Sequence, residues 1–254
     1  MASYLVTGSS KGLNLGFCNI LASKPASEVS KVFATARRHT DALKDLISRY
    51  PQRVEFVLMD VLSEESVQKA TEQVEKSLGG KGLDVLINGV GIMPFAPEGV
   101  HTVNNLDFIL NSNVLGAHLV TRNILPLLRK GNLKKVANIS TSLGSITLAP
   151  KYHTHMPTPA YKISKAALNM LTVQYAMDFA DQGFTFFAIC PGWVKTDLGG
   201  EFADLTIEQS VNAILNVVFN STPQANNGKF MNIHVPGWER SEGINQYNGG
   251  EIPW

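Results

Sequence analysis

Short apolar runs alternate with longer segments of helical periodicity along the whole chain, and this alternation constrains the fold more than any other feature. The apolar runs lie at residues 4–6, 31–35, 54–59, 85–87, 136–139 and 184–189. Segments with apolar residues at three- and four-residue spacing lie at 64–78, 106–129, 161–181 and 206–219. Strands that are apolar throughout and separated by helices are typical of a parallel sheet covered on both faces.

We therefore predict an α/β fold with a single domain over residues 1–254. Its core is expected to be a Rossmann-type doubly wound parallel sheet with helices on both faces. A last strand is expected near residues 229–233, and the polar, glycine-rich stretch 234–254 is expected to form an irregular C-terminal tail.

The composition argues against several classes of protein. A chain of 254 residues, 44% hydrophobic and 17% charged, suits one large globular domain. Its 22 basic and 21 acidic residues give a net charge of +1, so we expect neither a nucleic acid nor a membrane surface as partner. No apolar run approaches the roughly 18 residues of a membrane span, and no signal-peptide pattern is visible, so a cytoplasmic protein is expected.

Metal binding and disulfide formation are not expected. The only two cysteines, Cys18 and Cys190, lie in apolar surroundings and are predicted to be reduced core residues. His153 and His155 are two positions apart in a proline-interrupted stretch, but no carboxylate or cysteine pattern accompanies them. We interpret both histidines as loop residues that face solvent or substrate.

A glycine-rich turn follows the first predicted strand directly. Residues 7–16 read Thr-Gly-Ser-Ser-Lys-Gly-Leu-Asn-Leu-Gly and lead into an apolar helix. Glycines at such a turn let the backbone approach a pyrophosphate, which then rests at the positive N-terminus of the helix. We predict a dinucleotide site here, with a plain tight turn as the alternative. The candidate binding residues are Gly8, Ser10, Lys11, Gly12 and Leu13.

Two arginines, Arg37 and Arg38, close the second predicted strand, where an acidic residue would bind the ribose hydroxyls of NAD. A guanidinium pairs with phosphate, so the 2′-phosphate of NADP is the better fit, and Lys11 could add to it. The alternative is a solvated basic turn. Asp60, which closes the third strand, is placed to bind the adenine edge, unless it is only an acid at a helix N-terminus.

Tyr161 and Lys165 are four residues apart, a spacing that stacks the phenol and the ammonium on one face of a helix. A phenol has an unperturbed pKa of about 10, and a neighbouring cation lowers that pKa by favouring phenolate. Tyr161 could therefore exchange a proton with a hydroxyl or carbonyl oxygen. The alternative is an ordinary amphipathic helix with a surface lysine.

Several motifs occur in the order found in one protein family. They are residues 7–16, the segment Asn88-Gly-Val-Gly91, Asn113, the strand end at 138–144, the pair Tyr161/Lys165 and residues 191–196. In this order the chain resembles the short-chain dehydrogenase/reductase family over nearly its whole length. Details at residues 143–146, 192–199 and 247–254 resemble its carbonyl-reductase branch, which includes C-factor, Sniffer and fungal norsolorinic acid ketoreductase-like enzymes.

The resemblance implies a nicotinamide cofactor and a catalytic tetrad. It makes Tyr161 the acid–base residue, Lys165 the group that lowers its pKa and holds the nicotinamide ribose, and Asn113 the residue that positions a proton-relay water. The substrate-orienting serine falls on Thr141, or on Ser142 if the strand end is shifted by one residue. The further cofactor-binding residues that the resemblance implies are Val61, Asn88, Gly89, Pro191, Gly192, Val194 and Thr196.

Three residues depart from the family pattern. Asn14 replaces the third glycine of the turn, where asparagine tolerates a left-handed backbone but adds bulk beside the pyrophosphate. Gly89 removes an amide side chain from under the adenine ring. Thr141 replaces serine but still offers a donor and an acceptor.

We therefore expect NADPH-dependent reduction of a ketone or aldehyde to an alcohol, with Tyr161 as proton donor. Residues 144–160 and 193–206 are predicted to form substrate-site loops, and their apolar and aromatic content favours an apolar or aromatic, polyketide-like substrate. The alternatives are a cofactor-binding regulator or scaffold with reduced catalysis, or a non-redox dehydratase or cyclase. The resemblance also implies a homodimer or homotetramer built on residues 106–128 and 166–179.

Overall fold

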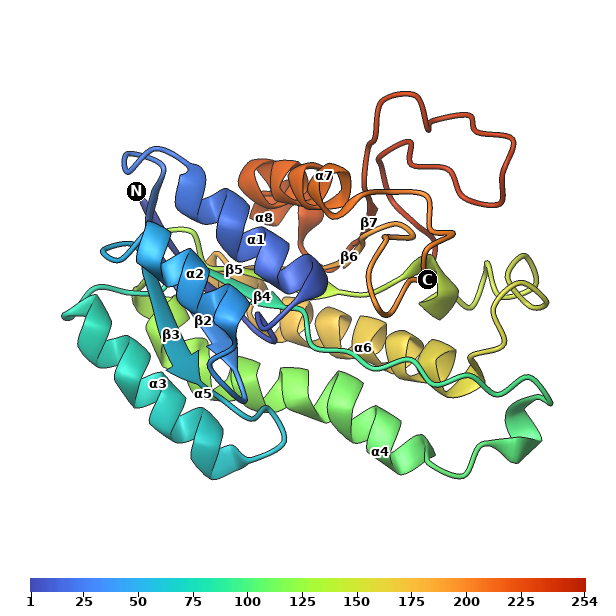
Figure 1. The fold of residues 1–254 in the computed structure, drawn as a ribbon, viewed down its shortest axis with the longest axis horizontal. Helices are drawn as coiled ribbons and strands as arrows, with labels where there is room; N and C mark the ends of the chain where they lie inside the picture. The colour runs from blue at the N-terminus through green and yellow to red at the C-terminus, as the bar shows by residue number, and fades with distance from the viewer.

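A computed structural model describes all 254 residues and shows one sheet of seven parallel strands, in the order β3-β2-β1-β4-β5-β6-β7 (Figure 1). The strands are β1 (Ala2–Val6), β2 (Val29–Ala36), β3 (Val54–Leu58), β4 (Val85–Asn88), β5 (Lys135–Ile139), β6 (Thr185–Cys190) and β7 (Phe230–Asn232). The strand order reverses between β1 and β4, which is where open parallel sheets form a crevice at their carboxyl ends.

Helices cover both faces of the sheet, as the sequence predicts. One core lies under α1 (Gly12–Ser23), α2 (Asp41–Arg49) and α7 (Ile207–Asn220). A second core lies under α3 (Glu64–Leu78), α5 (Gly116–Lys130) and α6 (Pro159–Asp178). The remaining short helices are α4 (Leu106–Leu110) and α8 (Pro223–Asn226). None of the helices combines the length and the apolar character that a membrane crossing needs.

Successive side chains of the strands enter opposite cores. Tyr4 and Val6 of β1 belong to the core under α1, whereas Leu5 between them belongs to the core under α5. A strand that is buried on both faces has no polar side, because its side chains alternate in direction. This burial explains the near-continuous apolar runs in the sequence.

Two predicted helices differ in detail from the expectation. The helix expected over 106–129 is interrupted by a π-helical turn, Asn111–Leu115, between α4 and α5. The helix expected from Tyr161 begins two residues earlier at Pro159, because proline suits the first turn of a helix, where its missing N–H leaves no bond unmade. Both differences lie next to the candidate site.

The predicted tail, residues 234–254, contains no regular helix or strand. Two isolated bridges, Met231–Glu251 and His234–Asn248, fix it beside β7. The ring of Trp254 stacks on Phe230 at 5.4 Å between centroids. The two ends of the tail are therefore packed against the domain, whereas its middle forms a loop that projects from the body of the molecule (Figure 1).

Candidate active site

One large cavity of about 840 Å³ lies along the carboxyl ends of the strands. Its walls come from the glycine turn after β1, from the ends of β2 to β6, from α6 and from the C-terminal tail. Nearly all the residues predicted for the site line this cavity. They are Gly8, Ser10, Lys11, Gly12, Leu13, Arg37, Asp60, Val61, Gly89, Thr141, Ser142, Tyr161, Lys165, Pro191, Gly192, Val194 and Thr196.

The glycine turn has the backbone that its composition predicts. Gly8 and Gly12 adopt left-handed φ angles of +71° and +60°, which residues other than glycine rarely adopt. No side chain caps the N-terminus of α1, and its first turn contains no acidic residue. These free amides at the positive end of a twelve-residue helix suit the pyrophosphate of a dinucleotide.

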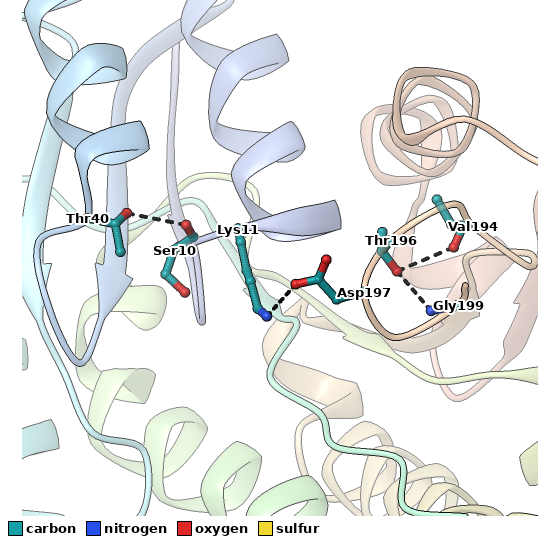
Figure 2. Close-up of polar contacts among 7 residues, drawn as sticks. All are labelled: Ser10, Lys11, Thr40, Val194, Thr196, Asp197 and Gly199. Atoms are coloured by element: carbon teal, nitrogen blue, oxygen red, sulfur yellow. Dashed lines mark hydrogen bonds and ion pairs between the residues drawn. The ribbon is translucent and has the colours of Figure 1, made fainter. Parts of the chain in front are cut away.

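Lys11 and Arg37 behave differently from one another. Lys11 Nζ pairs with Asp197 Oδ2 at 2.5 Å (Figure 2), and both residues line the cavity. The Lys11 ammonium thus has a partner in the 193–206 loop, and its expected contact with the phosphate stays a prediction. Arg37 lines the cavity and has no ion-pair partner. Thr40 donates a hydrogen bond to the carbonyl of Ser10 at 3.3 Å, which holds the β2 end beside the turn (Figure 2).

Asp60 and Asn88 also differ in their surroundings, because Asp60 faces the cavity and Asn88 does not. The Asp60 carboxylate accepts a hydrogen bond from the backbone of Leu62 and faces the cavity. Asn88 does not line it. Its buried amide donates to Thr121 Oγ1 at 3.0 Å and to Asn138 Oδ1 at 2.9 Å. The Asn88 side chain therefore joins β4 to α5 and β5, and a contact between Asn88 and a cofactor stays a prediction.

Tyr161 and Lys165 are both buried in α6, with 7% and 3% of their surfaces exposed. The alternative of a surface lysine is therefore wrong. Lys165 Nζ donates to the carbonyl of Ile139 at 2.7 Å and lies 5.6 Å from the centre of the Tyr161 ring. A cation over an aromatic face is attracted to the ring. The phenol and the ammonium thus share one wall of the cavity.

The pKa shifts of this pair run opposite to the sequence expectation. Burial raises the pKa of Tyr161 well above its usual value, and the nearby Cys190 thiol adds to the rise. Burial also lowers the pKa of Lys165 to about 8. Loss of water disfavours the charged form of both groups, and this loss outweighs the attraction between ammonium and phenolate.

Thr141 and Ser142 both face the cavity. Alternation along a strand would send them to opposite faces, but β5 ends at Ile139 and a 3₁₀ turn begins at Ser142. Thr141 Oγ1 accepts a weak hydrogen bond from the backbone of Leu143 at 3.3 Å. The Ser142 hydroxyl faces Tyr152, which also lines the cavity. The structure therefore offers two hydroxyl groups where the sequence expects one.

Asn113 lies in the π-helical turn between α4 and α5, and its side chain is fully engaged inside the protein. Its Oδ1 accepts from the backbone of Ile92 at 2.8 Å, and its Nδ2 donates to the Ile92 carbonyl at 3.0 Å and to Ser164 Oγ at 2.9 Å. Asn113 does not line the cavity. Its side chain fixes the segment after β4 against α6, next to Tyr161.

The segment after β6 forms the wall opposite α6. Thr196 Oγ1 donates to the Val194 carbonyl at 3.3 Å and accepts from the backbone of Gly199 at 3.1 Å, which closes a compact turn (Figure 2). Trp193 lines the cavity, but Phe202 does not and is 90% exposed. Of the predicted substrate-site loop 193–206, the Phe202 side chain is therefore not part of the cavity wall.

The C-terminal tail supplies residues that the sequence reasoning missed. Residues 244–248 and 251–253 line the cavity. Tyr247 is buried, and its hydroxyl donates to Asp204 and accepts from the backbone of Trp193 at 3.0 Å. The signal was present in the sequence, because an aromatic residue and an isoleucine in an otherwise polar tail, here Tyr247 and Ile252, indicate burial.

Comparison with known proteins places the chain among proteins of this architecture. The family described as short chain dehydrogenase matches residues 3–206. The short-chain dehydrogenase/reductase AacuF of Aspergillus aculeatus is 32% identical over 91% of this chain and 97% of its own length. An NADPH-bound carbonyl reductase from chicken fatty liver is similar with a TM-score of 0.83 and 31% identity, over 91% of each chain. Carbonyl reductase Sniffer of D. melanogaster gives a TM-score of 0.86 and 28% identity over the full length of both chains.

The buried lysine predicts a specific dependence of stability on pH. The folded protein releases the Lys165 proton near pH 8, whereas an unfolded lysine titrates near a pKa of about 10.4. Between these values the unfolded chain binds more protons, so this group makes the folded state more stable as pH rises. Relative to Lys165→Met, the wild type should gain free energy of unfolding from about pH 8 to about pH 10. Urea unfolding over this range tests the prediction, and parallel curves for the two proteins would contradict it.

Proposed function

The chain belongs to the short-chain dehydrogenase/reductase family, and on that premise we propose that it reduces a ketone or an aldehyde to an alcohol with NADPH. One observation carries the proposal: the buried Tyr161–Lys165 pair faces the same cavity as the glycine turn and Arg37. A proton donor and a dinucleotide site are thus combined in one enclosed space.

The residues along the cavity fit a phosphorylated nicotinamide dinucleotide. The first-turn amides of α1 would hold the pyrophosphate, next to Gly8 and Gly12. The unpaired guanidinium of Arg37 would hold the 2′-phosphate. Pro191 to Val194 would face the nicotinamide end, opposite Lys165. NADPH supplies a hydride when bound, and this is the part of the reaction that no side chain of the protein provides. NADPH-bound carbonyl reductase is also among the similar structures.

The chain's own groups supply the proton. The Tyr161 hydroxyl, whose pKa is raised by burial, is protonated near neutral pH and can give its proton to an alkoxide, which is a much stronger base than phenolate. As the substrate carbonyl becomes an alkoxide, the O–H bond of Tyr161 breaks and the proton moves to the substrate oxygen. Lys165 remains mostly charged at pH 7 because its pKa is about 8, and it stabilises the phenolate.

Thr141 and Ser142 would orient the carbonyl, since hydroxyl donors placed beside the developing negative charge lower the barrier of the reaction. The buried Asn113 is a positioning residue in this scheme, because its side chain bonds to Ile92 and Ser164 and not to the cavity. After proton transfer to the substrate, a relay water near Lys165 would reprotonate Tyr161.

The substrate end of the cavity supports an apolar or aromatic carbonyl compound, such as a polyketide-like ketone. Apolar and aromatic side chains from three separate segments meet there: Leu148, Tyr152, Met156, Trp193, Ile244 and Ile252. Such a wall binds apolar groups, while a few hydroxyl groups fix the orientation of the reacting oxygen.

We also propose a homodimer or homotetramer built on α5 and α6. Leu115, next to α5, and Met170 and Met177 of α6 are exposed large apolar side chains. Contact between copies of the chain would remove this apolar surface from water.

The reductase proposal is tested by incubating the purified protein with a panel of aromatic and aliphatic ketones and with NADPH deuterated at C4. We expect oxidation of NADPH and appearance of deuterium on the carbinol carbon of a product alcohol. Tight NADPH binding without turnover of any ketone would instead support a regulator. Conversion of a substrate without NADPH oxidation would support a dehydratase or cyclase. Either result would overturn the reductase.

The cofactor preference predicts the effect of removing Arg37. An Arg37→Leu variant should raise the KM for NADPH by about tenfold or more, because a charge-assisted bond to phosphate is lost. The KM for NADH, which lacks that phosphate, should change little. Arg38→Leu is the matched control, since Arg38 is adjacent but does not line the cavity. Equal effects of Arg37→Leu on both cofactors would contradict the assignment.

A further inference from the structure

Asn14, the third residue of α1, reaches across the floor of the cavity to the end of β4. Its Nδ2 donates to the Gly89 carbonyl at 2.8 Å, and it makes a longer contact of 3.4 Å with the carbonyl of Gly8. The backbone at Asn14 is helical, so this position does not require a residue that tolerates the left-handed conformation. The amide therefore links the glycine turn to the segment that follows β4.

Gly89 is a glycine for reasons of space, not of backbone conformation. Its φ angle is not in the left-handed region, so other residues could adopt the same backbone. A Cβ at this position, however, would lie 1.9 Å from Asn14 Oδ1. The side chain of Asn14 thus occupies the volume that a side chain of residue 89 would fill.

The Asn14 side chain is also poorly satisfied as a purely structural group. Its Oδ1 is buried and accepts no hydrogen bond. A buried acceptor without a partner destabilises a fold, so the Oδ1 atom itself does not explain why asparagine stands here. The position of Asn14 on the cavity wall points to a role in ligand binding instead.

The segment that Asn14 holds leads directly to the catalytic pair. The segment begins at Gly89 and ends at Ile92. The backbone N–H of Ile92 donates to Asn113 Oδ1, and the Ile92 carbonyl accepts from Asn113 Nδ2. Between Gly89 and Ile92, a Cβ on Gly91 would lie 3.5 Å from Lys165 Nζ. Residues 89–92 are therefore fixed by one asparagine at the glycine turn and by another next to α6.

We propose that Asn14 is a positioning residue that sets residues 89–92 for the bound dinucleotide, and that Gly89 is its required partner. We call Asn14 and Gly89 the exchange pair, because one space lies between them. Here the amide side chain of Asn14 fills that space from α1, and a side chain of residue 89 could fill it from the end of β4 instead. The inference rests on the proposed function only in taking NADPH as the ligand.

A double-mutant cycle tests the exchange pair with NADPH as the probe. The variants are Asn14→Ala, Asn14→Gly, Gly89→Asn and Asn14→Gly/Gly89→Asn. The Kd of NADPH is measured by fluorescence titration at a temperature at which every variant is folded, and the Tm of each is measured without NADPH. Asn14→Ala and Asn14→Gly should each raise the Kd by about fivefold or more through loss of the amide. Gly89→Asn should raise it at least as much, because the new side chain collides with Asn14.

The double variant decides the matter. In the double variant, an amide side chain from residue 89 fills the space that the Asn14 side chain fills in the wild type. The Kd of NADPH for the double variant should therefore recover to within about threefold of the wild-type value, which is a strongly non-additive result. Asn19→Ala is the matched control, since Asn19 lies on the same helix, does not line the cavity and should leave the Kd unchanged.

Two results would overturn the exchange pair. One is a double variant whose Kd equals the product of the two single effects. The other is an Asn14→Ala variant that lowers the Tm but binds NADPH like wild type, since that would make Asn14 merely structural. Failure of the wild type itself to bind NADPH would instead refute the cofactor assignment, so the two failures are distinguishable.

Discussion

The buried ammonium of Lys165 is the group on which the rest of the site depends. A lysine with only 3% of its surface exposed loses most of its hydration, which destabilises the fold unless the charge finds partners. The structure supplies the carbonyl of Ile139 at 2.7 Å and the face of the Tyr161 ring. The backbone packs closely around it as well, since a Cβ on Gly144 would lie 2.7 Å from Lys165 Cβ. Lys165 therefore helps to fix the end of β5 against α6, together with the hydrogen bonds Asn138–Thr172 and Ser140–Asn169.

The site is assembled by amides from neighbouring strands and helices. Asn113 joins the segment after β4 to α6, Asn14 joins the same segment to the glycine turn, and Asn88 joins β4 to α5 and β5. Because these bonds lie at the carboxyl ends of the strands, the reversal of strand order between β1 and β4 places the cavity among them. Parallel topology and a small set of buried amides together account for the shape of the site.

The sequence predicted the fold because its signal is local. A strand buried on both faces reads as an apolar run, and Tyr161 and Lys165 fall on one helix face through their spacing alone. The pKa direction of Tyr161 was not predictable in this way, because it depends on how completely tertiary packing removes water. The pairing of Lys11 with Asp197 joins residues 186 positions apart, and no local pattern reports such a contact.

For a similar reason, the sequence did not predict that the C-terminal tail lines the cavity, or that the Asn14 side chain fills the space beside Gly89. The tail has no periodicity, so its packing beside β7 follows only from long-range contacts such as that of Trp254 with Phe230. Each of Asn14 and Gly89 looks unfavourable when it is considered alone. Only the three-dimensional structure shows that the two positions share one volume.

In the proposed mechanism, the Tyr161 phenol, held beside Lys165, gives its proton to the substrate oxygen. The most direct test is the single-turnover rate of carbonyl reduction for Tyr161→Phe, with NADPH affinity measured in parallel. We expect a rate lower by about 10²-fold or more, because general acid catalysis is lost, and a nearly unchanged Kd for NADPH. Reduction of the ketone by this variant at the wild-type rate would show that Tyr161 is not the proton donor.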